Sequence, residues 1–313
     1  MLHDIKGDNA HPLIRATAKL MCLLSSGRTP LAVAFVLSAG GLSPFNKVAN
    51  EVNEETIRAG GAPAIRPVDN GVMLTKATTL LVCNSPSAKA AKKKLSPVQL
   101  GLGTRAGSEI AAHTMQALWE EGCVISGEDA VNGFNALTRQ SVLDAVALRW
   151  PEGSTFVETL YGHASPCFFT FRDNEDGQRI RVIASVEGTR MGCPLGNFGF
   201  DLAMAEFVYD KLYSEFKNQA IMRALTDDLI PAFKPPSDPD DLAAWEAVFD
   251  CIGRFWSRYD QLAGPIGIRR NPIKSALLLP TGAPLPLNKA RTGGILLKPT
   301  REGLKVGGAP VGC

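Results

Sequence analysis

Two long stretches of the chain repeat apolar residues at intervals of three and four, the spacing that puts side chains on one face of a helix. The first begins at Pro194, which suits a first helical turn because its missing N–H needs no partner there. The second follows residues 237–240 (SDPD). The apolar positions are Leu195, Phe198, Leu202, Ala205, Tyr209 and Leu212 in the first, and Leu242, Trp245, Phe249, Ile252 and Trp256 in the second. We predict a core-facing helix at each.

Between and before these helices the pattern changes to short apolar runs separated by polar turns. Residues 167–171 and 179–185 flank a polar turn at 172–177, and residues 221–225 and 229–233 flank Thr226-Asp227-Asp228. Both pairs predict β-hairpins. Further strands are predicted at 123–125 and 275–279, with a helix over 136–150 that stops at Pro151. This order predicts an α+β fold with helices packed on one face of an antiparallel sheet.

The two ends of the chain carry weaker patterns. Residues 13–26 predict a helix that Gly27 ends, and the apolar residues 31–39 predict a short buried element. Residues 48–64 and the Gly- and Pro-rich tail after Pro280 are predicted to be irregular. The cluster Lys89, Lys92, Lys93 and Lys94 is read as a solvated loop, with a phosphate-binding patch as the alternative.

Composition narrows the class of protein. The chain has 313 residues, 45% of them hydrophobic, which is enough for one large domain or two closely packed ones. The net charge of +2 leaves any nucleic-acid binding to local patches. Seven cysteines without a CxxC pair and four scattered histidines argue against a disulfide framework or a zinc site and fit a reducing compartment. No apolar run is long enough to cross a membrane, so no membrane partner is expected.

Asp129 and the pair Asp227-Asp228 are the candidate catalytic residues. Asp129 follows a predicted strand, and the pair lies at the tip of a predicted hairpin. Carboxylates at adjacent strand ends repel one another unless a cation lies between them. Such an arrangement can hold two divalent ions for phosphoryl transfer, and oxygen ligands beside phosphates favour Mg²⁺, with Mn²⁺ as an alternative. The spacing alone favours an Asp-Asp turn of no catalytic role.

Eight short motifs occur in an order that resembles the reverse transcriptase domain of non-LTR (LINE-type) retrotransposons. Residues 128–135 (EDAVNGFN) resemble that family's D-x-x-N-A-F-N, and residues 188–196 (GTRMGCPLG) resemble its G-x-R-Q-G-x-P-L. Residues 225–228 (LTDD) stand where the family has Y/F-x-D-D. The remaining matches are Asn46-Lys47, residues 65–68 (IRPV), residues 99–101 (QLG), residues 267–274 (GIRRNPIK) and residues 307–312 (GGAPVG). Together they cover about residues 46–312.

The resemblance implies a right-hand polymerase of fingers and palm. Residues 1–122 would form the N-terminal part of the fingers and residues 123–313 the palm, with about 164–198 returning to the fingers. A thumb is expected to be absent, and further domains of a parent polyprotein are expected. The implied activity is that of an RNA-dependent DNA polymerase, which adds dNTPs to the 3′ end of a DNA or RNA primer on an RNA template.

The family's residue roles carry over where the motifs match. Asp129, Asp227 and Asp228 would hold the metal ions, and Phe134 would exclude a 2′-hydroxyl. Lys47 and Arg66 would bind the triphosphate, Gly192 would allow close approach, and Lys274 would lie near the leaving group. Met191 would line the nucleotide pocket, and Gln99, Arg190 and Asn271 would contact template or primer. Each has a simpler alternative: Phe134 as core, Lys274 as a strand flank and Arg66-Pro67 as a turn.

Several positions depart from the family pattern. Met191 replaces a Gln that could donate a hydrogen bond, Leu225 replaces an aromatic residue, and Gly133 replaces an Ala. They favour a second hypothesis, a catalytically degraded, domesticated module that acts as an RNA- or protein-binding scaffold. Both hypotheses imply an intracellular protein, and the sequence does not decide between nucleus and cytoplasm.

Overall fold

A five-stranded sheet forms the centre of the molecule. The structure is a computed structural model that describes residues 10–95, 97–127, 129–172, 177–271, 274–286 and 297–312. Glu128, the turn residues 173–176, residues 272–273 and Cys313 therefore lie outside the described residues. The strand order is β6-β7-β3-β8-β9, antiparallel except for the β8–β9 pair. The strands are β3 (Val124–Gly127), β6 (Ala220–Leu225), β7 (Asp228–Phe233), β8 (Ala276–Leu278) and β9 (Lys298–Thr300).

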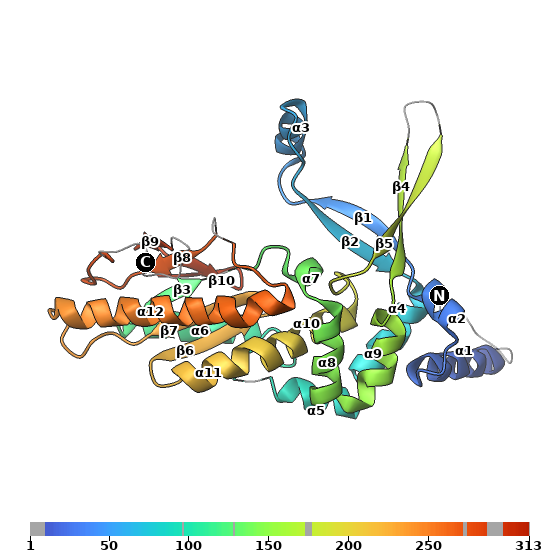
Figure 1. The fold of residues 1–313 in the computed structure, drawn as a ribbon, viewed down its shortest axis with the longest axis horizontal. Helices are drawn as coiled ribbons and strands as arrows, with labels where there is room; N and C mark the ends of the chain where they lie inside the picture. Colours follow the sequence, from blue (N-terminus) through green and yellow to red (C-terminus); the bar gives the residue numbers. More distant parts are fainter. Residues whose placement is uncertain are drawn as a thin grey trace.

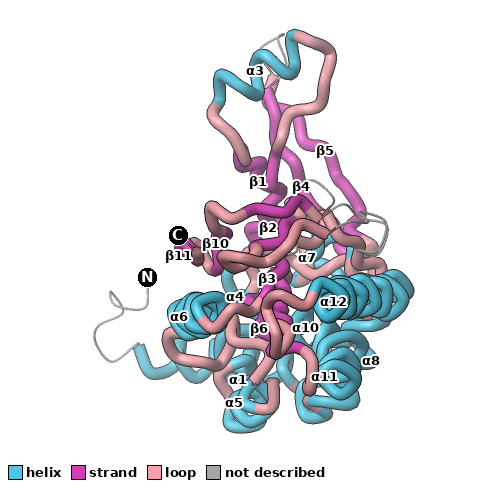
Figure 2. Tube along the Cα trace, turned by 90° about the vertical axis from the view of Figure 1, so that its left-hand side faces the viewer, coloured by secondary structure: helices cyan, strands magenta, loops and turns pink. Residues whose placement is uncertain are grey.

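Both faces of this sheet are covered, because alternate side chains along each strand point to opposite sides. Val124 packs with the cluster that includes α10 (Pro194–Met204), η3 (Ala205–Tyr209) and α12 (Leu242–Ala263). Its neighbour Ile125 packs with α6 (Gly107–Glu120) and with the hairpin of β10 (Leu304–Val306) and β11 (Ala309–Val311). Figure 2 shows α6 and α12 on opposite sides of the central strands. The sequence did not predict the α6 side.

A four-stranded sheet projects from the body of the molecule (Figure 1). Its order is β2-β1-β4-β5, in which β1 and β4 are parallel and the other pairs antiparallel. The strands are β1 (Gly40–Asn46), β2 (Ile65–Gly71), β4 (Ser165–Arg172) and β5 (Gln178–Ser185). The hairpin that begins at Ser165 thus joins the sheet that begins at Gly40, so residues 40–71 and 165–185 form one unit.

Helices form the base on which both sheets rest. The predicted long helix from Pro194 continues from α10 through η3, a turn of π-helix, into α11 (Asp210–Phe216). The other helices are α1 (Ala10–Ser25), α2 (Leu31–Leu37), α3 (Asn50–Arg58), α4 (Met73–Cys83), α5 (Pro86–Lys93), α7 (Gly133–Ala136), α8 (Arg139–Arg149) and α9 (Ser154–Tyr161), with short turns η2 (Pro151–Gly153) and η4 (Gly264–Ile266). The predicted α+β fold class is confirmed.

Several local predictions are wrong. The apolar run 31–39 is largely the exposed helix α2, in which Ala34 is buried but Leu31, Val33, Phe35 and Val36 are exposed. The region 48–64 contains the helix α3. The residue that this helix buries is the polar Asn53, so the sequence has no apolar stripe from which the helix could be predicted. Lys89, Lys92 and Lys93 lie on α5 rather than in a loop, and Lys94 directly follows the helix. The start of α5 could be predicted from the sequence, because Ser85 is a favoured N-cap residue and Pro86 suits the first turn. In the structure, Ser85 accepts a hydrogen bond from the Ala88 N–H.

The tail after Pro280 is also more ordered than predicted. β9 pairs with β8, and β10 and β11 form a hairpin whose two-residue turn is Gly307-Gly308. Both glycines have positive φ, 56° and 89°, which this tight turn requires and other residues adopt at a cost. A Gly-Gly pair between short apolar runs is a hairpin signal, so this element was open to prediction. None of the helices among the described residues combines the length and apolarity needed to cross a membrane.

Phe255 tests the packing of α12 on the central sheet. Its side chain is fully buried and meets Phe233 of β7 and Trp256 in edge-to-face contacts, with ring centroids 5.4 and 5.1 Å apart. We expect Phe255→Ala to lower the free energy of unfolding by about 3–5 kcal/mol, because the cavity cannot close fully. The matched control is Leu242→Ala, 65% exposed on the same helix, which should change it by less than about 0.5 kcal/mol. Urea unfolding measures both, and equal losses would contradict this packing.

Candidate functional site

A polar cleft of about 440 Å³ lies where the two sheets meet. It collects residues that are far apart in the sequence but belong to the predicted motifs. The predicted site residues among those lining it are Lys47, Arg66, Asp129, Phe134, Met191, Gly192, Asp227 and Lys274. Asp228 lines an adjoining cleft of about 520 Å³, which shares Arg66, Asp129, Asp227 and Lys274 with the first. Fold topology therefore brings nine of the twelve predicted residues to one place.

The carboxylates meet because of strand register. In the antiparallel β3–β7 pair, Ile125 lies opposite Ala232. β7 begins at Asp228 and Asp129 follows the end of β3 at Gly127, so both aspartates lie at the same end of this antiparallel pair. Burial raises the pKa of Asp228 to about 6, and the Asp227 and Asp129 carboxylates add to the rise. Burial is also the main cause that raises the pKa of Asp227. The site thus holds partly desolvated like charges close together.

Lys274 is the nearest cation to these carboxylates. Its ammonium forms an ion pair with an Asp129 carboxylate oxygen and lowers the pKa of both Asp227 and Asp228 against the larger effect of burial. The segment that carries Lys274 is fixed to Asp129 through the backbone, since the Asn271 N–H donates to the Asp129 carbonyl over 2.8 Å. Asn271, predicted to contact template or primer, is therefore placed next to Asp129 by its main chain.

Asp129 and Asp227 are the residues that could hold a divalent cation. Mg²⁺ takes hard oxygen donors and is usually held by one or two carboxylates, with water and substrate phosphates completing its coordination. Two partly buried carboxylates facing a polar cleft fit this pattern. Within the part of the chain that the structure describes, no group of three or more His, Cys, Asp or Glu side chains could hold a metal ion. The remaining ligands of such an ion would have to come from water and substrate.

Lys47 and Arg66 supply positive charge to the lining of the same cleft. The sequence places them far apart, but β1 and β2 are paired, with Phe45 opposite Arg66. The Lys47 N–H donates to the Ala64 carbonyl over 2.9 Å, which extends the pair by one residue. The helix α3 is inserted between the two strands. Both side chains are exposed, so they are accessible to an anionic ligand.

Phe134 and Met191 give the cleft its apolar surface. The Phe134 ring stacks on Phe200 of α10 with centroids 4.8 Å apart, which fixes its orientation while leaving it partly exposed. Met191 and Gly192 lie beside β2, where the Asp69 N–H donates to the Met191 carbonyl over 3.2 Å. Gly192 has φ of 94°, and an added Cβ would approach the Asp69 carbonyl oxygen to 3.3 Å. The close approach that Gly192 allows is thus to strand β2.

The turn that carries Asp227 is strained and is held by Gln99. Thr226 has φ of 59°, a left-handed conformation that is unfavourable for a β-branched residue. The Gln99 amide accepts from the Thr226 N–H over 3.0 Å and donates to the Thr226 carbonyl over 3.2 Å. The Tyr209 hydroxyl donates to the same carbonyl over 3.0 Å. These bonds keep both ends of the Thr226 peptide in place and so position Asp227.

Gln99 is fully buried, which corrects the prediction that it contacts template or primer. Its amide also donates to the Asp201 carboxyl over 3.1 Å and accepts from the Gly101 N–H over 2.7 Å. Asp201 of α10 is also fully buried. Burial raises its pKa well above the ordinary value, and the Asp227 carboxylate adds to this. Gln99, Asp201 and Tyr209 therefore form a buried support behind the turn, and the last two were missed by the sequence analysis.

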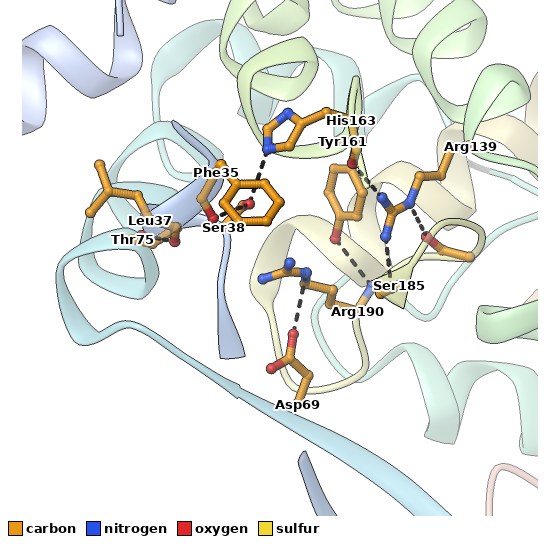
Figure 3. Close-up of polar contacts among 11 residues, drawn as sticks. Phe35, Leu37, Ser38, Asp69, Thr75, Arg139, Tyr161, His163, Ser185 and Arg190 are labelled. Atoms are coloured by element: carbon orange, nitrogen blue, oxygen red, sulfur yellow. Dashed lines mark hydrogen bonds and ion pairs between the residues drawn. The ribbon is translucent and has the colours of Figure 1, made fainter. Parts of the chain in front are cut away.

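Arg190 is also held inside the fold, although it lines a cleft of about 320 Å³. Its guanidinium lies 3.2 Å from the carboxylate of Asp69, and both side chains are almost completely buried (Figure 3). Gly40 makes this possible, because a Cβ there would collide with the Asp69 carboxylate at 1.6 Å. The Arg190 N–H also donates to the Tyr161 hydroxyl over 3.1 Å. Arg190 thus fixes the Met191 segment against β2, and its contact with template or primer stays a prediction.

Arg139, at the start of α8, holds the other end of the same segment. Its guanidinium donates to the His163 carbonyl, 2.7 Å, and to the Ser185 hydroxyl, 2.8 Å (Figure 3). It also donates to the Gly188 carbonyl at 3.3 Å. A buried arginine satisfied by neutral oxygens tightly orders the groups around it. The only sequence signal for this role would be its position directly after a helix N-terminus.

The fold is similar to that of a solved telomerase structure. A solved structure of telomerase from Candida albicans, in complex with a TWJ fragment of telomeric RNA, is similar to this chain with a TM-score of 0.50 at 10% identity. The match covers 82% of this chain and 45% of that chain. The apo telomerase of Candida tropicalis gives a TM-score of 0.49 at 12% identity, over 86% of this chain and 50% of that one.

This chain therefore spans about half the length of the telomerase chains it resembles, and at such identity the likeness extends to the fold alone. No protein-family model matches the sequence, and no curated protein matches it.

The support behind the turn can be tested by Gln99→Ala. The change removes four hydrogen bonds and takes the Gln99 partner from the buried Asp201 carboxyl and from the Thr226 and Gly101 N–H groups, so we expect a loss of about 3 kcal/mol in the free energy of unfolding. Gln140→Ala, on the exposed side of α8, should be nearly neutral. A denaturation curve of Gln99→Ala that overlays the parent would contradict the role of Gln99.

The raised pKa of Asp228 predicts a pH dependence in buffer without divalent ions. A carboxyl with a pKa near 6 in the folded chain and 3.8 in the unfolded chain binds its proton more tightly when folded. Its contribution to stability is therefore complete below about pH 4 and is lost as the pH rises through 6. We expect Asp228→Asn to be more stable, relative to the parent, at pH 7.5 than at pH 4.5. Urea unfolding at both values tests this, and a pH-independent difference would contradict it.

Proposed function

We propose that this chain is the fingers and palm core of a reverse transcriptase of the non-LTR retrotransposon kind. It would add dNTPs to a primer 3′ end on an RNA template. The observation that carries the proposal is the single cleft that gathers Asp129, Asp227, Lys47, Arg66 and Lys274 from five distant motifs. A lining of both charges suits a substrate that carries a triphosphate and a cation. The telomerase bound to telomeric RNA, with its similar fold, supports an RNA partner.

The carboxylates would provide the metal site. Asp129 and Asp227, with Asp228 beside them, would hold Mg²⁺ or Mn²⁺, which when bound neutralises phosphate charge and activates the attacking oxygen. The raised pKa of Asp227 and Asp228 in the absence of a cation supports this, because a bound cation would offset the repulsion that burial intensifies. The hydrogen bonds of Gln99 and Tyr209 with Thr226 would maintain the position of Asp227 through each reaction cycle.

The other lining residues would bind and orient the nucleotide. Lys47 and Arg66 would bind the triphosphate, where the planar guanidinium of Arg66 suits two phosphate oxygens at once. The Phe134 ring, held by Phe200, would lie under the sugar and exclude a 2′-hydroxyl. Lys274 would hold a proton near the leaving group. Its ion pair with Asp129 would have to open as the substrate enters.

A second candidate, a non-catalytic RNA- or protein-binding scaffold, is favoured by two observations in the cleft. The Lys274 ammonium already neutralises Asp129, and Met191 stands where an amide would donate a hydrogen bond. Under that hypothesis the acidic residues serve the fold only. Tight RNA binding that Asp227→Ala leaves unchanged would support it.

Primer extension on poly(rA)/oligo(dT) with Mg²⁺ or Mn²⁺ separates the two candidates. We expect extension by the parent and a loss of about a hundredfold or more in Asp227→Asn, since loss of a metal ligand raises the activation free energy by several kcal/mol. Asp240→Asn, on the exposed loop before α12, is the matched control and should extend normally. No extension by the parent, with Asp227→Asn indistinguishable from it, would reject the enzymatic function.

Met191→Gln tests whether the altered nucleotide pocket limits activity. The introduced amide faces the cleft and could donate to a bound nucleotide, so we expect KM for dTTP to fall by about tenfold, the effect of one hydrogen bond of about 1.4 kcal/mol. Met191→Leu preserves the apolar character and should leave KM unchanged. A Gln variant with the parent's KM would show that position 191 does not contact the nucleotide.

A further inference from the structure

The β4–β5 hairpin projects beyond the rest of its sheet as a two-stranded ribbon. β1 pairs with β4 at Cys167 and Phe168 only, whereas β5 pairs with all of β4 from Ser165 to Arg172. Figure 1 shows the distal part of the hairpin standing clear of the helices. A ribbon of two strands is marginally stable by itself and gains stability from a partner. Its two faces differ in chemistry, and this difference identifies the partner.

One face of the ribbon combines aromatic rings with arginine. Phe169 and Phe171 are stacked along β4, with ring centroids 5.9 Å apart and planes 18° apart. Residues directly opposite in an antiparallel pair share a face, and Phe169 lies opposite Arg181 while Phe171 lies opposite Arg179. The Arg181 guanidinium lies 5.8 Å from the centroid of the Phe171 ring. Both phenylalanines are partly exposed, and both arginines are exposed.

We propose that this face is a binding platform for single-stranded nucleic acid. Aromatic rings on an open sheet stack with unpaired bases of any sequence, and adjacent arginines pair with the phosphates and stack on rings and bases. Base pairing in a duplex hides the base faces, so the platform prefers a single strand. The pairing of two aromatic residues with two arginines on one face matches this ligand.

The platform leads into the nucleotide cleft. Cys167 and Ile183 continue the same alternation toward the base of the ribbon, where they line a cleft of about 320 Å³. This cleft shares Pro67, Asn135 and Met191 with the 440 Å³ cleft. A strand lying on Phe169 and Phe171 would therefore reach Met191 along a continuous surface. That this strand is the unpaired part of the template rests on the proposed function. Binding of a single strand by the ribbon does not depend on it.

The opposite face of the ribbon provides a matched control. It carries Phe168, Ile180 and Val182, which are 41%, 65% and 59% exposed. The positions of Thr170 and, at the distal end, Arg172 share this face, whereas Arg179 and Arg181 lie on the other face beside Phe169 and Phe171. Phe168 is thus an exposed phenylalanine on the same strand, adjacent to Phe169, but outside the proposed platform.

Fluorescence anisotropy with labelled oligo(rU) of roughly 16 nucleotides tests the platform. The full chain is used in EDTA without dNTPs, so the result is independent of polymerase activity. We expect the Phe169→Ala/Phe171→Ala double variant to bind about tenfold or more weakly, and Phe168→Ala to bind within about twofold of the parent. Arg181→Gln should lower the slope of log Kd against log salt by about 0.7, the value for one phosphate contact on a single strand.

Tryptophan fluorescence reports the contact directly and guards against a misfolded double variant. A base stacked on position 171 should quench the added tryptophan of Phe171→Trp when oligo(rU) is titrated, whereas the added tryptophan of Phe168→Trp should not respond. Equal losses of affinity in Phe168→Ala and the double variant, or equal responses of the two tryptophan variants, would overturn the proposal. A parent that binds as expected but extends no primer would reject the polymerase function and leave the platform standing.

Discussion

The repulsion among Asp129, Asp227 and Asp228 is the constraint to which the rest of the site responds. These carboxylates come together because β3 and β7 are neighbours in register, and burial makes their charges harder to solvate. Such an arrangement is unfavourable unless positive charge is near. Lys274 supplies part of it through its ion pair with Asp129, and Lys47 and Arg66 line the same cleft. The cleft is therefore an anionic site surrounded by cations, which suits a metal–triphosphate ligand.

Holding this arrangement requires a second layer of buried polar residues. All the donors and acceptors of the Gln99 amide form hydrogen bonds, with Gly101, with Asp201 and with the N–H and carbonyl of Thr226. They maintain a turn conformation that Thr226 would not adopt alone. On the other side of the cleft, the Asp69–Arg190 ion pair fixes Met191 against β2. Both layers place strain or buried charge directly behind lining residues, which is a common feature of functional sites.

Long periodic elements and the acidic motif were predictable from the sequence, because their signals are local. The stripe from Leu195 to Leu212 and the hairpin around Asp227-Asp228 specify their own secondary structure. The helix α3 could not be predicted, because this polar helix has no stripe of apolar residues repeating at helical spacing. The roles of Gln99 and Arg190 were also beyond reach, since a motif residue that binds substrate and one that supports the site look alike in one sequence. Only burial separates them, and burial depends on the whole fold.

Binding of Mn²⁺ in the presence of dTTP, followed by the loss of the free-ion signal in electron paramagnetic resonance, tests the central claim most directly. If the carboxylates hold a cation together with substrate phosphates, the parent should bind Mn²⁺ more tightly when dTTP is present than dTTP or the protein does alone. Asp227→Asn should lose this increase, and Asp240→Asn should retain it. Equal Mn²⁺ binding by the parent and Asp227→Asn would contradict the account of the cleft as a metal–nucleotide site.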